Sequence, residues 1–329
     1  MMRNLSAKPN RIKRRALPLT AICLALATAL SGCFTGVEST PVISGKDVKR
    51  QRASTLSAEQ RYLADIRPAA PSLWAPGKRF IVTDSRIGIV LDASTDAISG
   101  TRRTPTPGDT LRLVAAAPTP TLTEQPEMTL TFIGAHGDSL AYHTGIDERN
   151  WKSRQSIEIP FTIDADLIDS VARRLVGKYL YIIAQRRMSW PDGNIIAPRR
   201  YVGVTVRNVR GGTAELPVIV VIEPDDAPGT LQAVYMTLGD GATATRNFDK
   251  VFALENPRSR YPQIEDDVWQ LICDGKIRLG MTPDECRLSL GAPTEYLKIP
   301  STSGMVERWT YPDGVYLIFE DGVLARYRR

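Results

Sequence analysis

The sequence is poor in the side chains that most often carry chemistry. Among 329 residues it holds two histidines and four cysteines. Both histidines, His136 and His143, lie in the segment "GAHGDSLAYHT". We interpret them as incidental members of a hairpin rather than as metal ligands or a catalytic base. Neither histidine has a cysteine nearby at a spacing typical of a metal site.

Known catalytic motifs are also missing. The sequence contains no G-x-S-x-G turn, no phosphate-binding Gly-rich loop and no H-E-x-x-H helix. Paired carboxylates from distant positions are the one enzymatic arrangement that it leaves open. One acidic cluster opens an expected helix, where carboxylates favour the helix dipole: Asp164, Asp166 and Asp169. A second lies in a Pro/Gly-rich turn and is expected to be solvated: Glu223, Asp225 and Asp226. We therefore predict no enzymatic activity, no metal and no small-molecule cofactor.

The N-terminus resembles a lipoprotein signal. Residues 1–15 are basic and lack acids, and residues 16–30 are apolar but shorter than the roughly 20 residues that span a bilayer. The segment ends in "LSGC", which resembles the bacterial lipobox. This resemblance implies cleavage before Cys33, lipidation of Cys33 and attachment to a membrane. An ordinary signal peptide with a chance cysteine is the alternative.

Removing this leader changes the charge of the protein. The whole chain carries 42 Lys and Arg against 36 Asp and Glu. The six basic residues of the leader account for the whole excess: Arg3, Lys8, Arg11, Lys13, Arg14 and Arg15. A formally neutral remainder lacks the basic surface of a nucleic-acid binder, so no nucleic-acid partner is expected.

Two cysteines remain after the leader and the lipidated residue. Cys273 and Cys286 fall at apolar positions of expected helices, so we favour buried thiols. A disulfide between them is the alternative, because an oxidising envelope would permit it.

The composition of the chain changes along its length. Residues 34–57 are polar and without periodicity, which is typical of a tether, and a short helix is expected around Ala58–Ile66. From residue 74 to 261, short runs rich in β-branched residues alternate with turn clusters, interrupted by one helix that Gly177 ends. We predict five regions: a signal peptide (1–32), a lipidated tether with a short helix (33–73), two β-modules (74–163 and 164–261) and an α+β domain (262–329).

A weak internal similarity supports two modules. "WAPGKRFIVT" at 74–83 and "RLVGKYLYII" at 174–183 both place Gly-Lys before an aromatic and aliphatic strand. The fold class expected is mainly β: one or two small barrel-like or sandwich-like modules, followed by two helices and an antiparallel sheet. One larger sandwich would give the same signals in the β region.

The segment "LGMTPDECRLSLGAP" contains a complete set of helix boundary signals. Thr282 is the expected N-cap, Pro283 suits the first helical position, and Glu285 completes a capping box. Gly291 and the following Pro293 end the helix. A helix that precedes this one is expected over residues 264–275. Near the C-terminus, Asp-Gly at 321–322 predicts a hairpin turn between two strands.

These C-terminal motifs carry a family resemblance. "IRLGMTPDECRLSLGAP" and "ERWTYPDGVYLIFEDGVLARYR" resemble the SmpA/OmlA family, the BamE-like outer-membrane lipoproteins. The resemblance covers about 262–329. It implies two helices packed on an antiparallel sheet, a lipid anchor in the Gram-negative outer membrane, and a role in outer-membrane assembly or integrity.

The last strands also carry an aromatic cluster: Trp309, Tyr311, Tyr316 and Phe319. Core packing is the simpler interpretation, and a contact face for a partner is the alternative. Together these features lead us to expect a non-catalytic lipoprotein of the outer membrane that binds an envelope protein. A glycan- or peptidoglycan-binding lipoprotein, or an inhibitor or regulator of another envelope protein, are the alternatives.

Overall fold

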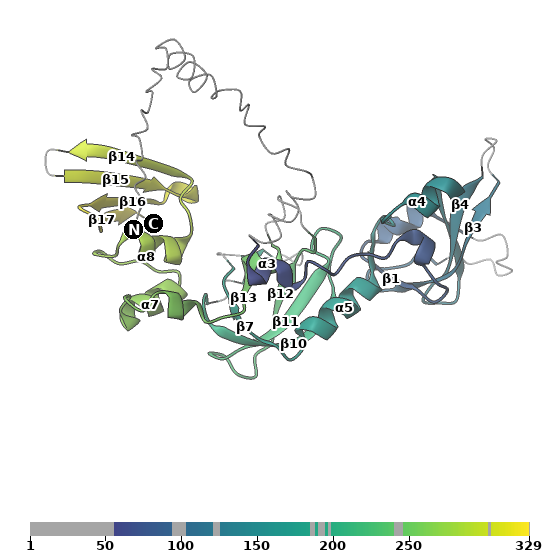
Figure 1. Ribbon diagram of the computed structural model, residues 1–329, viewed down its shortest axis with the longest axis horizontal. Helices are drawn as coiled ribbons and strands as arrows, with labels where there is room; N and C mark the ends of the chain where they lie inside the picture. Colours follow the sequence, from purple (N-terminus) through teal and green to yellow (C-terminus); the bar gives the residue numbers. More distant parts are fainter. Residues whose placement is uncertain are drawn as a thin grey trace, which may run out of the picture. The chain divides into compact units, whose positions relative to one another are not determined.

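A computed structural model describes residues 56–93, 103–120, 126–184, 188–189, 195–196, 199–239, 246–301 and 304–328. The predicted signal peptide, the tether and Cys33 lie outside these residues. The described chain is mainly β, as predicted, with three antiparallel sheets and a few short helices (Figure 1). One of the sheets is curled into a half-barrel. In the described part of the chain, no helix combines the length and the apolar character needed to span a membrane.

The first sheet is six-stranded, in the order β2-β5-β4-β3-β1-β6. Its strands are β1 (Arg79–Val82), β2 (Leu91–Ala93), β3 (Thr110–Thr119), β4 (Glu127–Ile133), β5 (Ser139–Asp147) and β6 (Thr162–Asp164). The 3-10 helices η1 (Pro71–Leu73) and η2 (Ser85–Ile89) and the helix α4 (Glu148–Ser153) complete this part. The 3-10 helix η2 separates β1 from β2 along the chain. The core of this part is aromatic and aliphatic, with Phe80, Phe132 and Trp151 buried.

The second sheet is five-stranded, in the order β12-β11-β10-β7-β13. Its strands are β7 (Tyr179–Ile182), β10 (Gly203–Gly211), β11 (Val218–Pro224), β12 (Gln232–Met236) and β13 (Phe252–Ala253). A separate two-stranded ribbon joins β8 (Met188–Ser189) to β9 (Ile195–Ile196). The helices of this part are α5 (Ala165–Leu175), α6 (Phe248–Val251) and the 3-10 helix η3 (Pro257–Arg260). Residues Ile168, Val171 and Leu175 of α5 are buried in its core, as the helical spacing predicts.

The short N-terminal helix α3 (Ala58–Tyr62) also packs on this second core. Leu63 belongs to the core, and the ring of Tyr62 stacks on Phe248 at 4.9 Å between centroids. The segment that packs on the second sheet therefore precedes the whole first sheet in the sequence. Sequence spacing could not show this, because α3 lies far from its packing partners along the chain.

These two sheets repeat one topology. In each, the second, third and fourth strands form a meander, and the first strand pairs with the second. A short fifth strand then pairs with the free side of the first. We call β1, β3, β4, β5 and β6 the first repeat, and β7, β10, β11, β12 and β13 the second repeat. The Gly-Lys similarity in the sequence marks the start of each repeat.

Backbone hydrogen bonds match between the repeats. The amide of Gly77 donates to the carbonyl of Leu113 at 2.7 Å, and that of Gly177 donates to Val206 at 2.9 Å. The pairing of the second strand shifts by a β-bulge directly after Leu113 and again after Val206. The amide that follows the first strand also bonds an equivalent carbonyl before the fifth: Thr83 to Phe161, and Ile183 to Val251, each at 2.8 Å.

The C-terminal part has its own core. Helix α7 (Asp266–Cys273) and helix α8 (Pro283–Leu290) precede a sheet of four strands in the order β14-β15-β16-β17. The strands are β14 (Glu295–Ser301), β15 (Gly304–Thr310), β16 (Tyr316–Glu320) and β17 (Val323–Arg328), with the 3-10 helix η4 (Pro312–Gly314) before β16.

The boundaries of α8 agree with the sequence signals. The Thr282 side chain accepts a hydrogen bond from the Glu285 amide, and the Glu285 carboxylate accepts one from the Thr282 amide. Gly291 follows at φ 87°, a backbone conformation that disfavours a side chain. The capping box and the glycine stop are therefore confirmed.

Candidate functional site

Most of the predicted aromatic cluster lies in the C-terminal core. Trp309 and Phe319 are fully buried, with ring centroids 4.8 Å apart. Tyr311 is 8% exposed and its hydroxyl donates to the Gly291 carbonyl at 3.0 Å. Core packing therefore describes these three residues, which are not available to a partner. Tyr316 is partly exposed, with the Arg308 guanidinium 5.8 Å from its ring.

The opposite face of the same sheet is open and partly apolar. Because neighbouring residues of a strand point to opposite faces, the partners of buried Trp309 and Phe319 define the inner face. Cross-strand pairing then places the alternate positions on the outer face. Its apolar members, which we call the outer patch, are Leu297, Ile299, Val306, Tyr316, Ile318 and Val323.

Exposure confirms that little covers the outer patch. Leu297 is 54% exposed, Ile299 51% and Val323 43%. On the inner face Trp309, Leu317 and Phe319 are buried, whereas the inner-face side chains toward the strand ends, such as Met305 at 47%, are also exposed. Arginine side chains alternate with the apolar positions on this face: Arg308, Arg326 and Arg328. One of them is neutralised, since the Arg326 guanidinium lies 2.7 Å from the Glu320 carboxylate. The outer patch is thus an apolar surface with a partly basic margin.

The histidines are separated in the first sheet. His136 is exposed in the β4–β5 turn. His143 Nδ1 lies 3.0 Å from Glu127 and 3.1 Å from the Thr129 hydroxyl, while Nε2 is 3.7 Å from Asp92. The two carboxylates therefore face opposite ring nitrogens and cannot converge on one ion. Among the residues that the structure describes, no group of three or more potential ligands could hold a metal.

The acidic cluster at the start of α5 does more than cap the helix. Asp164 caps α5 by accepting from the Asp166 amide at 3.0 Å. Lys78, whose side chain is 5% exposed, also lies 2.8 Å from Asp164 and 2.6 Å from Asp166. Arg79 pairs with Asp169 at 2.5 Å. This network ties the first repeat to α5. Sequence reasoning missed Lys78 as a partner because nothing local links it to residues so far along the chain.

The second acidic cluster is paired rather than only solvated. Glu223 lies 2.6 Å from Arg207, and the Gly229 amide together with the Arg207 side chain holds the Glu223 pKa below its usual value. Asp225 accepts from the Tyr179 hydroxyl at 2.5 Å, which raises the pKa of that phenol. Asp226 lies 3.2 Å from Arg199. These bonds close the turn against its own sheet.

A buried arginine connects the second repeat to the C-terminal core. Arg200 is 7% exposed and donates to the carbonyl of Ser289 at 3.0 Å, and also to the carbonyl of Leu288, both near the end of α8. The amide of Arg200 bonds the Cys273 carbonyl at the end of α7. Since a helix C-terminus leaves unpaired carbonyls and attracts cations, Arg200 satisfies both helices from outside them.

Both remaining cysteines are free thiols buried in the C-terminal core. Burial raises the pKa of Cys286 to about 12 and raises that of Cys273 above its ordinary value. At neutral pH both are protonated and unreactive, because the thiolate is the nucleophile. The structure therefore agrees with buried thiols rather than with a disulfide.

Comparison with known proteins gives no relative. No family model, no curated protein and no solved structure matches this chain. The function must therefore be argued from the chemistry of its own surfaces.

Proposed function

We propose that this protein is a non-catalytic, lipid-anchored interaction module of the Gram-negative outer membrane, which binds an envelope protein through the outer patch. The outer patch is the observation that carries the proposal. Aliphatic side chains that stay exposed together on one sheet face are typical of protein-binding sites. A deep pocket with facing carboxylates would have favoured an enzyme instead.

The C-terminal architecture supports the family resemblance as part of this proposal. Helices α7 and α8 share one core with the inner face of the four-stranded sheet. That arrangement is of the kind the resemblance to BamE-like lipoproteins implies. The lipid anchor rests on the "LSGC" sequence, with Cys33 as the modified residue.

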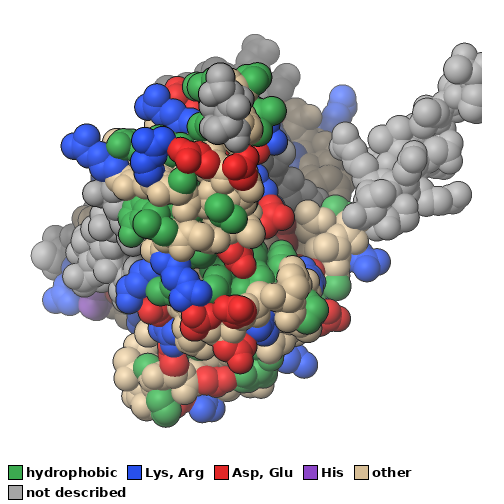
Figure 2. Space-filling model, turned by 90° about the vertical axis from the view of Figure 1, so that its left-hand side faces the viewer, with side chains coloured by type: hydrophobic (Ala, Val, Ile, Leu, Met, Phe, Trp, Pro, Cys, Tyr) green, Lys and Arg blue, Asp and Glu red, His purple; other side chains and the backbone are tan. Residues whose placement is uncertain are grey.

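Charge indicates the chemistry of the partner. The face in Figure 2 mixes basic and acidic side chains with hydrophobic ones, which does not favour a polyanion such as nucleic acid. The outer patch itself carries Arg308 and Arg328 without a carboxylate partner among the described residues. The surface that fits it is apolar with an acidic margin, and a protein supplies both.

The test compares two substitutions in the tagged full-length protein, crosslinked in membranes. Leu297→Asp places a charge in the outer patch, and Leu231→Asp changes a leucine of similar exposure that directly precedes β12. We expect Leu297→Asp to weaken capture of one defined partner about 30-fold, corresponding to loss of an anchor worth about 2 kcal/mol. Leu231→Asp should leave capture unchanged. Equal capture by both variants would contradict a role for the outer patch.

A further inference from the structure

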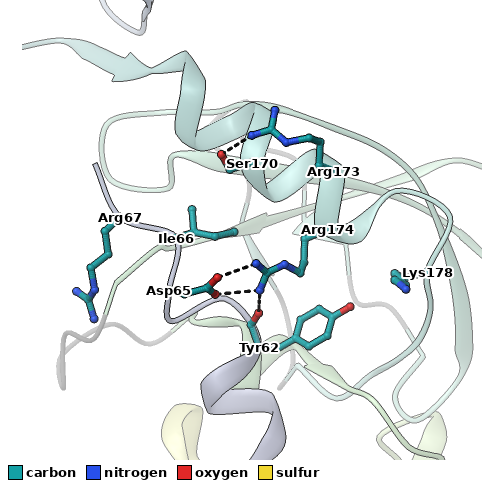
Figure 3. A pocket seen from close by; sticks show the side chains of 8 residues that line it. All are labelled: Tyr62, Asp65, Ile66, Arg67, Ser170, Arg173, Arg174 and Lys178. Atoms are coloured by element: carbon teal, nitrogen blue, oxygen red, sulfur yellow. Dashed lines mark hydrogen bonds and ion pairs between the residues drawn. The ribbon is translucent and has the colours of Figure 1, made fainter. Parts of the chain in front are cut away.

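The pocket where α3 and the chain after it meet the end of α5 joins two segments of the chain (Figure 3). Arg174 donates to both oxygens of Asp65, at 2.9 and 2.7 Å, and to the Tyr62 carbonyl at 2.7 Å. The other basic side chains that line the pocket point away from one another. The contacts of this pocket therefore hold the N-terminal segment on α5, and a surface open to a partner lies elsewhere, in the C-terminal sheet.

Strand β14 forms one edge of the C-terminal sheet and, among the described residues, has a neighbouring strand on one side only. The opposite edge is partly occupied. At β17, the Gly280 amide donates to the Leu324 carbonyl at 2.9 Å, and the Leu324 amide donates to the Met281 carbonyl at 2.7 Å. Within the described ranges, no comparable backbone hydrogen bond reaches the free side of β14. An unpaired strand edge of this kind is a template for pairing with another chain.

The side chains of β14 are exposed on both faces of the sheet. Leu297 and Ile299 belong to the outer patch and are 54% and 51% exposed. Tyr296 lies on the inner face, because it pairs with Trp309, yet it is 51% exposed. A partner that covers only the outer face would leave Tyr296 in solvent. A strand added beside β14 would contact both faces, because its own side chains alternate between them.

Lys298 does not carry a free charge that would protect this edge from pairing, as edge lysines often do. Its ammonium lies 2.6 Å from the Glu307 carboxylate on β15 and 5.7 Å from the centre of the Tyr296 ring. The charge of Lys298 is therefore neutralised within its own sheet, and the edge remains open to another strand.

Pro300 shows which backbone amides face the free edge. It pairs with Met305 in a register that has no shift. A proline inside a strand has no amide hydrogen to donate, so its nitrogen faces away from the neighbouring strand. Because the backbone orientation repeats every two residues, the amides of Tyr296 and Lys298 also face away from β15. Pro300 ends this row, so residues 295–299 are the part of the edge that can pair.

We propose that β14 pairs with an extended segment of the partner protein, which becomes an additional strand of the C-terminal sheet. This inference rests on the proposed function and adds how the partner binds. The segment carries apolar side chains beside Leu297 and Ile299, so that it extends the outer patch. In this mode of recognition the backbone hydrogen bonds supply affinity and the alternate side chains supply specificity.

The first experiment removes one amide from the free edge. In the tagged full-length protein, crosslinked in membranes, Lys298→Pro should weaken capture of the partner about tenfold, through a lost hydrogen bond. Lys298→Ala keeps the amide and should leave capture unchanged. Circular dichroism checks that both variants are folded. Equal capture by the two folded variants overturns the proposal, whereas a loss in Leu297→Asp alone would leave the proposed function standing without the added strand.

The second experiment leaves the backbone unchanged. A photo-crosslinking phenylalanine derivative replaces either Tyr296 or Leu297, and mass spectrometry locates the crosslinked residues of the captured protein. Strand pairing predicts that both positions crosslink to one short segment of a single partner, at residues an odd number of positions apart. Crosslinks from Leu297 alone, or from neither position, overturn the proposal. Crosslinks from both positions to a second copy of this chain overturn it as well, because β14 would then pair with itself.

Discussion

In the first repeat, the lysine after the turn glycine is buried, whereas in the second repeat its counterpart is exposed. The backbone around both lysines is the same, with equivalent hydrogen bonds on either side. What differs is the end of the fifth strand and the segment after it. Asp164, the last residue of β6, and Asp166, which follows in α5, both pair with Lys78. After β13 the chain continues with Leu254, Glu255 and an Asn-Pro turn, and among the described residues no carboxylate pairs with Lys178.

A second difference lies at the turn before the second strand. The amide of Gly108 donates to Val82 at 2.8 Å, and the amide of Tyr201 donates to Ile182 at 2.6 Å, so the two residues are equivalent. In the first repeat this is a Pro-Gly turn. In the second, Arg200 and Tyr201 extend from it to the end of α8. The same turn position is therefore an ordinary turn in the first repeat and a connection to the C-terminal core in the second.

The largest expected effect separates the two lysines. Lys78→Gln leaves Asp164 without its partner at a mostly buried site, and breaking such a pair costs about 3 kcal/mol of unfolding free energy. Lys178→Gln removes a solvated charge and should cost less than about 0.5 kcal/mol. Urea unfolding of both variants gives the comparison. Similar destabilisation by both variants would show that the carboxylate pairing of Lys78 does not make it more important for stability than Lys178.

The next effect concerns the connection made by the second repeat. Arg200→Met removes a buried cation from two helix carbonyls, and we expect a loss of about 2 kcal/mol, the range for hydrogen bonds to charged groups. Thermal unfolding followed by tryptophan fluorescence measures it. Arg210→Met, at an exposed position of β10, is the control. A stability equal to that of the control would mean that the connection contributes nothing.

A smaller effect is expected at the equivalent turn of the first repeat. Gly108 has φ 95°, so Gly108→Val should cost about 2 kcal/mol or slightly less through backbone strain. Gly134→Ala, at a glycine outside the positive-φ region and with only ordinary contacts, should change stability by less than about 0.5 kcal/mol. Circular dichroism melts decide between them. Equal melting temperatures would argue against a strained conformation at Gly108.

The smallest effect lies outside the repeats. Thr282→Ala removes the N-cap of α8 and should cost about 1 kcal/mol. Because Cys286 is buried in this helix, its alkylation rate at neutral pH reports the opening of the C-terminal core. We expect faster alkylation in Thr282→Ala than in Ser57→Ala, which removes the equivalent cap from α3. If both variants alkylate at the same rate, the cap does not limit the opening of this core.

The sequence by itself determined the local elements of this protein. Helix α8 has its predicted cap, first residue and stop, because those signals act within one turn of the backbone. The Asp-Gly pair at 321–322 forms the expected hairpin turn, with φ 50° and 82°. The Gly-Lys similarity also marked the two repeats, since the turn geometry depends on the glycine.

Only the tertiary structure decided which distant residues meet. The packing of α3 on the second repeat, the pairing of Lys78 with α5 and the reach of Arg200 to α8 all join segments far apart in the sequence. The sequence predicted an aromatic cluster on the last strands, but not which face of their sheet is covered. Trp309 and Phe319 are inside and the outer patch is open because the helices α7 and α8 pack on one side, and a one-dimensional pattern does not specify that choice.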